Sequence, residues 1–480
     1  MKKGFIVFVI ICLFNNVKAQ ILVSALKIAT KTTTQVAQVL GSSTGPYNAV
    51  NIYKITYNTK DPFNNNTIAS GAAFVPSMAC DNYPLVAYCH GTVLKKTQVP
   101  SAQYDYNYEG LFFSGKAYVV AMPDYLGLGD NPGYHPYLHA ATEASATIDL
   151  IRAVREFLAD STSIDLNGQV FVTGYSQGGH AAMATLKQIE ENNLQSEFNI
   201  VAGAPMSGPY SLSRVQPQTI ADSIHSYNGF SPYVVNSYQY VYGNLYTNIS
   251  NYYDYPYDTV IPPYLNGNYT FDSFNNILPT NIYDFMNDSV LDEFMADTIL
   301  FSTPLRHALK LNDNYAWNSS KPLRLCYCGS DDLVLPGNSI VAADSMMQMG
   351  SQSVIAINLN PAGDHFTCFS PAMAYVRTWF DSLKVACTST VGLSQYQAPN
   401  YSVDFFPNPA NKHIQVKSTN KIATIYLTDL NGKVITEYNN INKLEFLINT
   451  ENINNGFYLL KCTDISNNSI YKKIVISKNT

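Results

Sequence analysis

The stretch that most constrains this chain is the motif G-Y-S-Q-G at residues 174–178. The apolar run 170–172 precedes it and predicts a buried parallel strand, while the amphipathic run 181–189 follows it and predicts a helix. The glycines two residues before and two residues after Ser176 have no Cβ, so the strand and the helix can approach each other. The pattern predicts a sharp strand–turn–helix that presents the Ser176 hydroxyl at a helix N-terminus, which is the arrangement of a nucleophile elbow.

Apolar runs alternate with a helical pattern around this motif and predict the rest of a sheet. The expected elements are strands at 85–89, 117–122 and 200–204 and a helix at 143–158. Strand–helix–strand alternation is typical of parallel strands joined by right-handed crossovers. Upstream, the runs 50–57 and 68–76 predict an antiparallel pair, with the edge strand at 50–57. The fold class is therefore α/β with a mostly parallel sheet.

The alternation stops after residue 204 and resumes at 323–328. The residues between, about 206–318, are rich in tyrosine and asparagine and do not continue the sheet pattern. An insertion of this length predicts a cap or lid over the functional site. Its aromatic composition suits an apolar ligand and a sugar-bearing ligand equally well.

Two later strand ends carry the other residue types that a serine nucleophile needs. The run 323–328 ends in G-S-D-D at 329–332, and the next run leads to G-D-H at 363–365. A histidine removes the proton of the serine hydroxyl, and a carboxylate orients that histidine. We expect Ser176, Asp332 and His365 to form such a triad. Position favours Asp332, and the neighbouring Asp331 is the alternative.

Backbone amides near the nucleophile are candidates for binding an oxyanion. The amide of Gln177 lies at the start of the expected helix, and H-G-T at 90–92 follows the early strand 85–89. We therefore assign oxyanion binding to the backbone of Gln177 and to that of Gly91 or Thr92. A turn without a catalytic role is the alternative interpretation of 90–92.

The N-terminus has the features of a signal peptide. Two lysines are followed by the apolar run 5–14 and by V-K-A at 17–19, which predicts a signal peptide at 1–19 with cleavage before Gln20. The run is too short to span a membrane, so we expect a secreted chain without a transmembrane helix. The net charge of −6 and the absence of a long basic run argue against a nucleic-acid partner.

Seven of the eight cysteines remain after that cleavage, and export permits disulfides. Cys80–Cys89 and Cys368–Cys387 are candidate pairs that the spacing does not establish. The two cysteines of the run 323–328 are interpreted as packing residues of a buried strand. No spacing of cysteine and histidine is typical of a metal site, so we expect neither a metal nor a cofactor.

The composition changes near residue 388. Residues 388–403 contain Thr, Ser, Gln and Pro and are interpreted as a linker, so the catalytic domain is expected at 20–387. From 404 to 480, short alternating runs predict a small all-β sandwich.

Residues 84–370 resemble the secretory lipase family of α/β-hydrolases, the family of the fungal lipase A enzymes. The motifs that carry the resemblance are G-K-A-Y-V-V at 115–120, P-D-Y-L-G at 123–127, the helix from Glu143 and G-Y-S-Q-G-G-H at 174–180. The resemblance implies an α/β-hydrolase fold with an inserted lid, an ester substrate and a triad at Ser176, Asp332 and His365. H-G-T at 90–92 and the aromatic, Asn-rich insertion depart from the family pattern.

The tail resembles the C-terminal sorting domain of the type IX secretion system of Bacteroidetes. The motifs are F-P-N-P at 406–409, L-T-D-L-N-G-K at 427–433, G-F-Y-L-L-K at 456–461 and K-I-V-I-S-K at 473–478. The resemblance implies passage across the outer membrane by the type IX machinery. A carbohydrate-binding module is the rival interpretation of the tail, but no clear platform of aromatic residues supports it.

The favoured function is a secreted lipase or esterase that forms an acyl-enzyme on Ser176, with a small-molecule or lipid ester as substrate. A serine peptidase of the same fold is one alternative. A non-catalytic surface-binding protein is the other.

Overall fold

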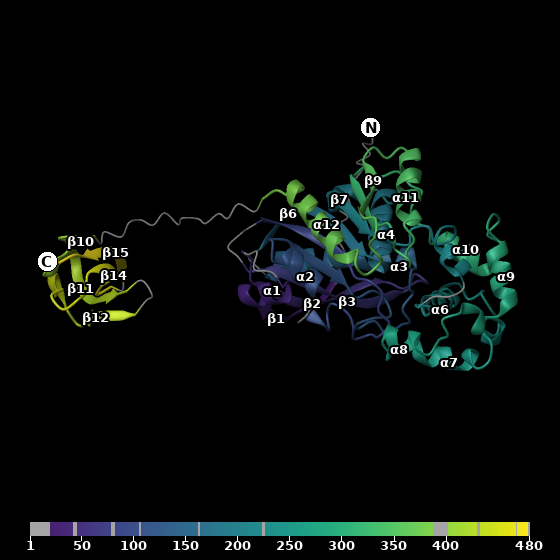
Figure 1. Cartoon of the computed structure of the whole chain (residues 1–480), viewed down its shortest axis with the longest axis horizontal. Helices are drawn as coiled ribbons and strands as arrows, with labels where there is room; N and C mark the ends of the chain where they lie inside the picture. The colour runs from purple at the N-terminus through teal and green to yellow at the C-terminus, as the bar shows by residue number, and fades with distance from the viewer. Residues whose placement is uncertain are drawn as a thin grey trace, which may run out of the picture. The chain divides into compact units, whose positions relative to one another are not determined.

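The computed structural model describes residues 20–41, 46–77, 82–104, 107–161, 164–222, 226–386, 402–429, 433–466 and 468–478. The chain divides into two compact units between Ser389 and Thr390 (Figure 1). The expected signal peptide and most of the expected linker lie outside the described residues, as do Cys80 and Cys387. Within the described ranges, no helix is both long enough and apolar enough to cross a membrane.

The first unit is built on a nine-stranded sheet in the order β1-β2-β3-β5-β4-β6-β7-β8-β9. Its strands are β1 (Leu22–Lys31), β2 (Val50–Lys60), β3 (Asn66–Pro76), β4 (Asn82–Cys89), β5 (Val119–Pro123), β6 (Asp165–Tyr175), β7 (Ile200–Met206), β8 (Leu323–Cys328) and β9 (Val354–Asn360). The first four strands in this order, β1, β2, β3 and β5, pair with one another in antiparallel fashion. From β5 onward, through β4, β6, β7, β8 and β9, all pairs are parallel. The predicted α/β fold with a mostly parallel sheet is confirmed.

The edge strand is β1, so the expectation of an edge strand at 50–57 is wrong. The pair β2–β3 forms as predicted, but β2 also pairs with β1. All ten β1 residues are exposed or half-buried, and the strand has a neighbouring strand on one side only. Its hydrophobic alternation is therefore weak, and that is why the sequence pattern missed it.

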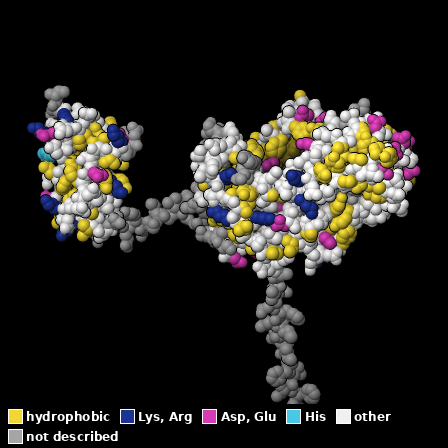
Figure 2. All heavy atoms as spheres, turned by 90° about the horizontal axis from the view of Figure 1, so that it is seen from below, with side chains coloured by type: hydrophobic (Ala, Val, Ile, Leu, Met, Phe, Trp, Pro, Cys, Tyr) yellow, Lys and Arg dark blue, Asp and Glu magenta, His cyan; other side chains and the backbone are white. Residues whose placement is uncertain are grey.

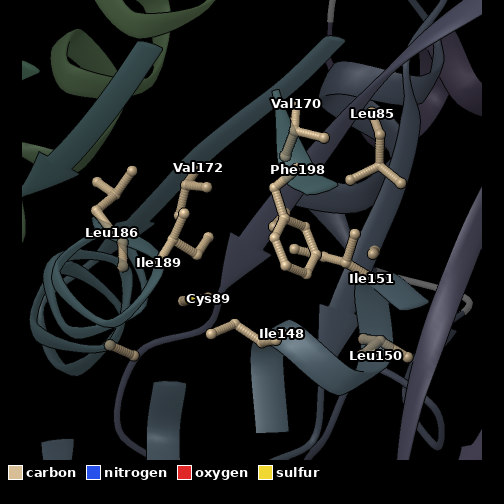
Figure 3. Packing of buried hydrophobic residues seen from close by; sticks show 14 of the residues in the cluster. Leu85, Cys89, Ile148, Leu150, Ile151, Val170, Val172, Leu186, Ile189 and Phe198 are labelled. Atoms are coloured by element: carbon tan, nitrogen blue, oxygen red, sulfur yellow. The ribbon is translucent and has the colours of Figure 1, made fainter. Parts of the chain in front are cut away.

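Helices cover both faces of this sheet, and the sheet separates the apolar core into two layers. One face carries α3 (Ala140–Ser161), α4 (Gln177–Glu191), α5 (Gln195–Phe198) and α11 (Gly337–Gln348), and the other carries α1 (Thr33–Val39), α2 (Tyr108–Ser114) and α12 (Phe369–Leu383). Successive strand side chains alternate between the two layers: Leu85 and Val170 lie in the first, and Phe171 lies in the second. Figure 3 shows the first layer, in which Leu85, Val170 and Val172 of the strands lie in one cluster with Ile151 of α3 and Leu186 of α4.

The insertion between β7 and β8 forms its own helical layer. It contains η2 (Gln216–Asp222), α6 (Phe230–Tyr242), η3 (Ile249–Asn251), α7 (Tyr257–Tyr264), α8 (Phe271–Asn275), η4 (Ile282–Asp284), α9 (Asp288–Ala296) and α10 (Pro304–Leu311). Tyrosines fix it to the sheet domain: the hydroxyl of Tyr233 donates to the Val93 carbonyl at 3.0 Å, and that of Tyr238 donates to the Leu138 carbonyl at 2.9 Å. Buried tyrosine supplies apolar area together with one polar tip that needs a partner, which explains the tyrosine-rich composition.

The second unit is a six-stranded antiparallel sheet with its own apolar core. Its strands are β10 (Val403–Phe406), β11 (His413–Thr428), β12 (Val434–Tyr438), β13 (Lys443–Asn449), β14 (Gly456–Asp464) and β15 (Ser469–Ile476). The predicted all-β class of the tail is confirmed. On the face drawn in Figure 2, the charged side chains of both units are scattered in small groups among uncharged ones.

Candidate active site

Ser176 lies in the turn between β6 and α4 with a backbone φ of 61° and ψ of −121°. A non-glycine residue in this region is strained, and such strain is typical of functional turns. The flanking glycines make the turn possible, because a Cβ at Gly178 would overlap the carbonyl of Cys89 and one at Gly174 would overlap the carbonyl of Gly178. The local sequence therefore produces the expected sharp turn and holds the serine at the start of α4.

His365 lies in the loop between β9 and α12, directly beside Ser176. Its Nε2 is 2.9 Å from the Ser176 Oγ. The hydroxyl of Tyr175 donates to the His365 carbonyl at 2.5 Å and fixes the backbone of this loop. The histidine side chain is 7% exposed, so its ring is largely shielded from water.

The acid that meets His365 is Asp331, and the expectation that Asp332 does so is wrong. An Asp331 carboxylate oxygen lies 2.8 Å from His365 Nδ1. The other oxygen accepts the amide N–H groups of Leu333 and Val334 at 3.2 and 2.8 Å. The turn after β8 buries Asp331 and leaves the Asp332 side chain exposed.

A disulfide joins the end of β8, just before the turn that carries the acid, to the loop that carries the histidine. It links Cys328, three residues before Asp331, with Cys368, three residues after His365. This bond corrects the cysteine expectations: Cys368 does not pair with Cys387, Cys89 is in no disulfide, and Cys328 is more than a packing residue. The pattern missed the pair because Cys328 and Cys368 are brought together by two neighbouring strands, 40 residues apart in sequence.

The backbone groups expected to bind an oxyanion lie close to Ser176. Gln177 is the first residue of α4, where an amide N–H has no partner within the helix. A Cβ placed on Gly91 would be 3.5 Å from the Tyr175 carbonyl oxygen and 4.0 Å from the Ser176 Cβ. The hydroxyls of Thr92 and Tyr137 are 2.9 Å apart. The structure thus brings the turn at 90–92 beside Ser176.

A buried polar network that the sequence reasoning missed holds the Gln177 side chain. Its Nε2 donates to Glu143 at 2.9 Å and to the His135 Nε2 at 2.9 Å. Burial lowers the pKa of His135 to about 3, so this imidazole is neutral and donates from Nδ1 to the Leu126 carbonyl. The other Glu143 oxygen lies 2.6 Å from His180 Nδ1. These contacts fix the first turn of α4 beneath the serine.

An apolar cavity opens over Ser176 and His365. Its volume is about 150 Å³, and the insertion supplies most of its wall. The apolar residues that line it are Leu138, Pro209, Leu212, Pro217, Ile220, Phe230, Val234, Val235, Ile282, Met286, Val290, Leu291, Phe294, Leu305, Leu309, Leu333 and Val334. A mostly apolar cavity that also contains polar groups, here including Ser176, Asn228 and His365, is typical of a small-molecule site.

Comparison with protein families gives two matches. The secretory lipase model matches residues 107–381, more than half of the 480 residues. The model of the secretion system C-terminal sorting domain matches residues 404–477. The second unit is therefore a sorting tail of the type IX system, which directs the chain out of the cell. Among curated proteins, no sequence matches this chain.

Solved structures agree with the family match. A ligand-bound form of the rice cell wall degrading esterase LipA from Xanthomonas oryzae is 30% identical with a TM-score of 0.69, over 76% of this chain and 98% of that chain. A hydrolase from Legionella pneumophila, described as putative, is 23% identical with a TM-score of 0.70, over 76% of this chain and 98% of that chain. Candida antarctica lipase A is 16% identical with a TM-score of 0.57, over 77% of this chain and 84% of that chain, and like the Legionella protein it shows the shared fold. The chain belongs to the secretory lipase family.

Proposed function

We propose that this protein hydrolyses carboxylic esters in two steps through an acyl-enzyme on Ser176. The observation that carries the proposal is the chain of hydrogen bonds from Asp331 through His365 to Ser176, which ends at an apolar cavity. A serine, a histidine and a buried carboxylate at these distances form the arrangement that activates a serine hydroxyl for acyl transfer.

In the first step, His365 Nε2 takes the proton of the Ser176 hydroxyl as the oxygen attacks the ester carbonyl. The amides of Gln177 and of the turn at 90–92 bind the negative charge that develops on the carbonyl oxygen. His365 then gives the proton to the leaving alcohol, and the acyl group stays on Ser176. In the second step, water adds to the acyl-enzyme by the same route and releases the acid, while Asp331 stabilises the imidazolium each time.

The cavity supports an aliphatic acyl group as the substrate part that is bound. Its walls are mostly aliphatic and aromatic side chains from α6, α9, α10 and residues 209–220, which precede α6. Each buried CH₂ contributes about 0.8 kcal/mol, so kcat/KM is expected to rise with acyl length until the cavity is filled. The related LipA is an esterase, which agrees with an ester rather than a peptide as substrate.

The test is the hydrolysis of 4-nitrophenyl esters from acetate to palmitate by the wild-type chain and by Ser176→Ala. We expect wild-type turnover that increases beyond acetate, and a loss of at least about 10⁴-fold in kcat for Ser176→Ala. A fluorophosphonate should label the wild type and leave Ser176→Ala unlabelled. If a peptide library were cleaved faster than every ester, the serine peptidase would replace the esterase. If neither labelling nor turnover occurred, the non-catalytic surface-binding protein would replace the esterase as the favoured interpretation.

A further inference from the structure

We propose that Asp332 selects against negative charge at the opening of the cavity, both in substrates and in the carboxylate product. This proposal rests on the proposed function and extends it to the charge of the ligand. It gives Asp332 a role in specificity in place of the triad role that the structure assigns to Asp331.

The charge of the cavity lining comes from a single carboxylate. Among the described residues that line the cavity, Asp332 is the only acid, none is a lysine or an arginine, and His365 is the only histidine. Asp332 both lines the cavity and is exposed, so it stands where the cavity meets the solvent. No described lysine or arginine forms an ion pair with it. Its charge therefore acts on any group that enters.

Hydrolysis creates a negative charge at this place. Water cleaves the bond between the acyl carbon and Ser176 Oγ, the serine regains its proton from His365, and the released acid loses its own proton to the solvent at neutral pH. The neutral ester that entered has become an anion in a cavity whose lining carries one carboxylate, that of Asp332. Two negative charges within one cavity repel each other, and none of the described residues that line the cavity is a lysine or an arginine that would hold the product.

The experiment compares two chromogenic esters with the same acyl group, neutral 4-nitrophenyl butyrate and anionic 3-carboxy-4-nitrophenyl butyrate. The measured quantities are the ratio of their kcat/KM values and the inhibition constant of butyrate. In Asp332→Asn, we expect the preference for the neutral ester to fall and butyrate inhibition to tighten, each roughly five- to tenfold, the effect of two unit charges about 6 Å apart at a partly solvated site. High salt should reduce the difference between wild type and Asp332→Asn in both the ester preference and the butyrate inhibition constant, because salt screens the charge.

Two controls isolate the charge. Asp332→Glu keeps the negative charge and should keep the wild-type ratio of kcat/KM between the neutral and the anionic ester. Asp364→Asn removes an exposed carboxylate next to His365 that does not line the cavity, and it should also keep the ratio. An unchanged ratio and unchanged butyrate inhibition in Asp332→Asn would overturn the proposal, as would an equal effect of Asp364→Asn. Serine-dependent hydrolysis of the neutral ester tests the proposed esterase function by itself. The esterase function and the charge selection by Asp332 can therefore fail separately.

Discussion

Two adjacent carboxylates, Asp331 and Asp332, have opposite surroundings. Asp331 is buried and receives two backbone N–H groups besides the contact with His365. Asp332 is exposed at the cavity opening. A buried carboxylate is stable only when its oxygens are hydrogen-bonded, and this turn supplies those partners to one of the two positions. The roles that we propose for the pair thus depend on which side chain the backbone after β8 turns inward.

This difference gives a residue-level prediction for Asp331→Asn. The amide keeps the size of the side chain but removes the negative charge that stabilises the His365 imidazolium, so kcat should fall by about 10³–10⁴-fold. The wild type, Asp331→Asn and Asp364→Asn are compared by steady-state hydrolysis of one neutral ester. Asp364→Asn keeps the oxygen that accepts from Thr367 and should retain the wild-type kcat. A kcat for Asp331→Asn within tenfold of wild type would contradict the assignment of the acid.

At the same scale, the sequence predicted those residues whose position follows from a strand end. Ser176 directly follows β6 and His365 lies in the loop after β9, as expected, because apolar runs locate buried strands well. The choice between Asp331 and Asp332 depends on the turn geometry, which has no hydrophobic pattern. The pair Glu143–His180 escaped notice because its members belong to two different helices, 37 residues apart.

Among the elements, the disulfide between the end of β8 and the loop after β9 fixes the acid relative to the histidine. Backbone bonds support the same contact: the Gly329 amide donates to the Asn360 carbonyl at 2.9 Å, and the Ser330 amide donates to the Gly363 carbonyl at 3.1 Å. The Cys328–Cys368 bond closes the segment between them, which contains α11 and β9. Parallel strands place both loops at the same edge of the sheet, so a bond between them acts directly on the proposed triad.

The prediction at this scale concerns the double variant Cys328→Ala/Cys368→Ala. The disulfide closes a loop of 40 residues. Its removal should lower the free energy of unfolding by about 3–4 kcal/mol, measured by urea denaturation. We also expect slower fluorophosphonate labelling and a lower kcat, with KM changed less, because the cavity wall lies mainly in the insertion. Cys326→Ala is the matched control, a buried thiol on β8 that is in no disulfide. If only stability changed, the bond would have no positioning role.

At the scale of the whole molecule, the chain combines a hydrolase unit and an export unit with separate cores. The sheet domain buries its own apolar layers, and the tail buries a separate cluster around Ile414, Ile425 and Leu460. Their division into two compact units agrees with the two family matches, which cover 107–381 and 404–477. A unit with its own core can fold without the other.

A chain that ends at Ala386 should therefore keep the ester kcat and the melting temperature of the hydrolase unit. It should fail to appear outside the cell, because the sorting tail has been removed. The complementary chain, residues 402–480 fused behind a signal peptide and a fluorescent protein, should be exported in a type IX-competent host. Activity is measured on the purified chains, and export is measured in culture medium and on intact cells. A truncated chain that lost activity while remaining folded would show that the tail takes part in catalysis, since removal of an independent unit leaves the triad and the cavity intact.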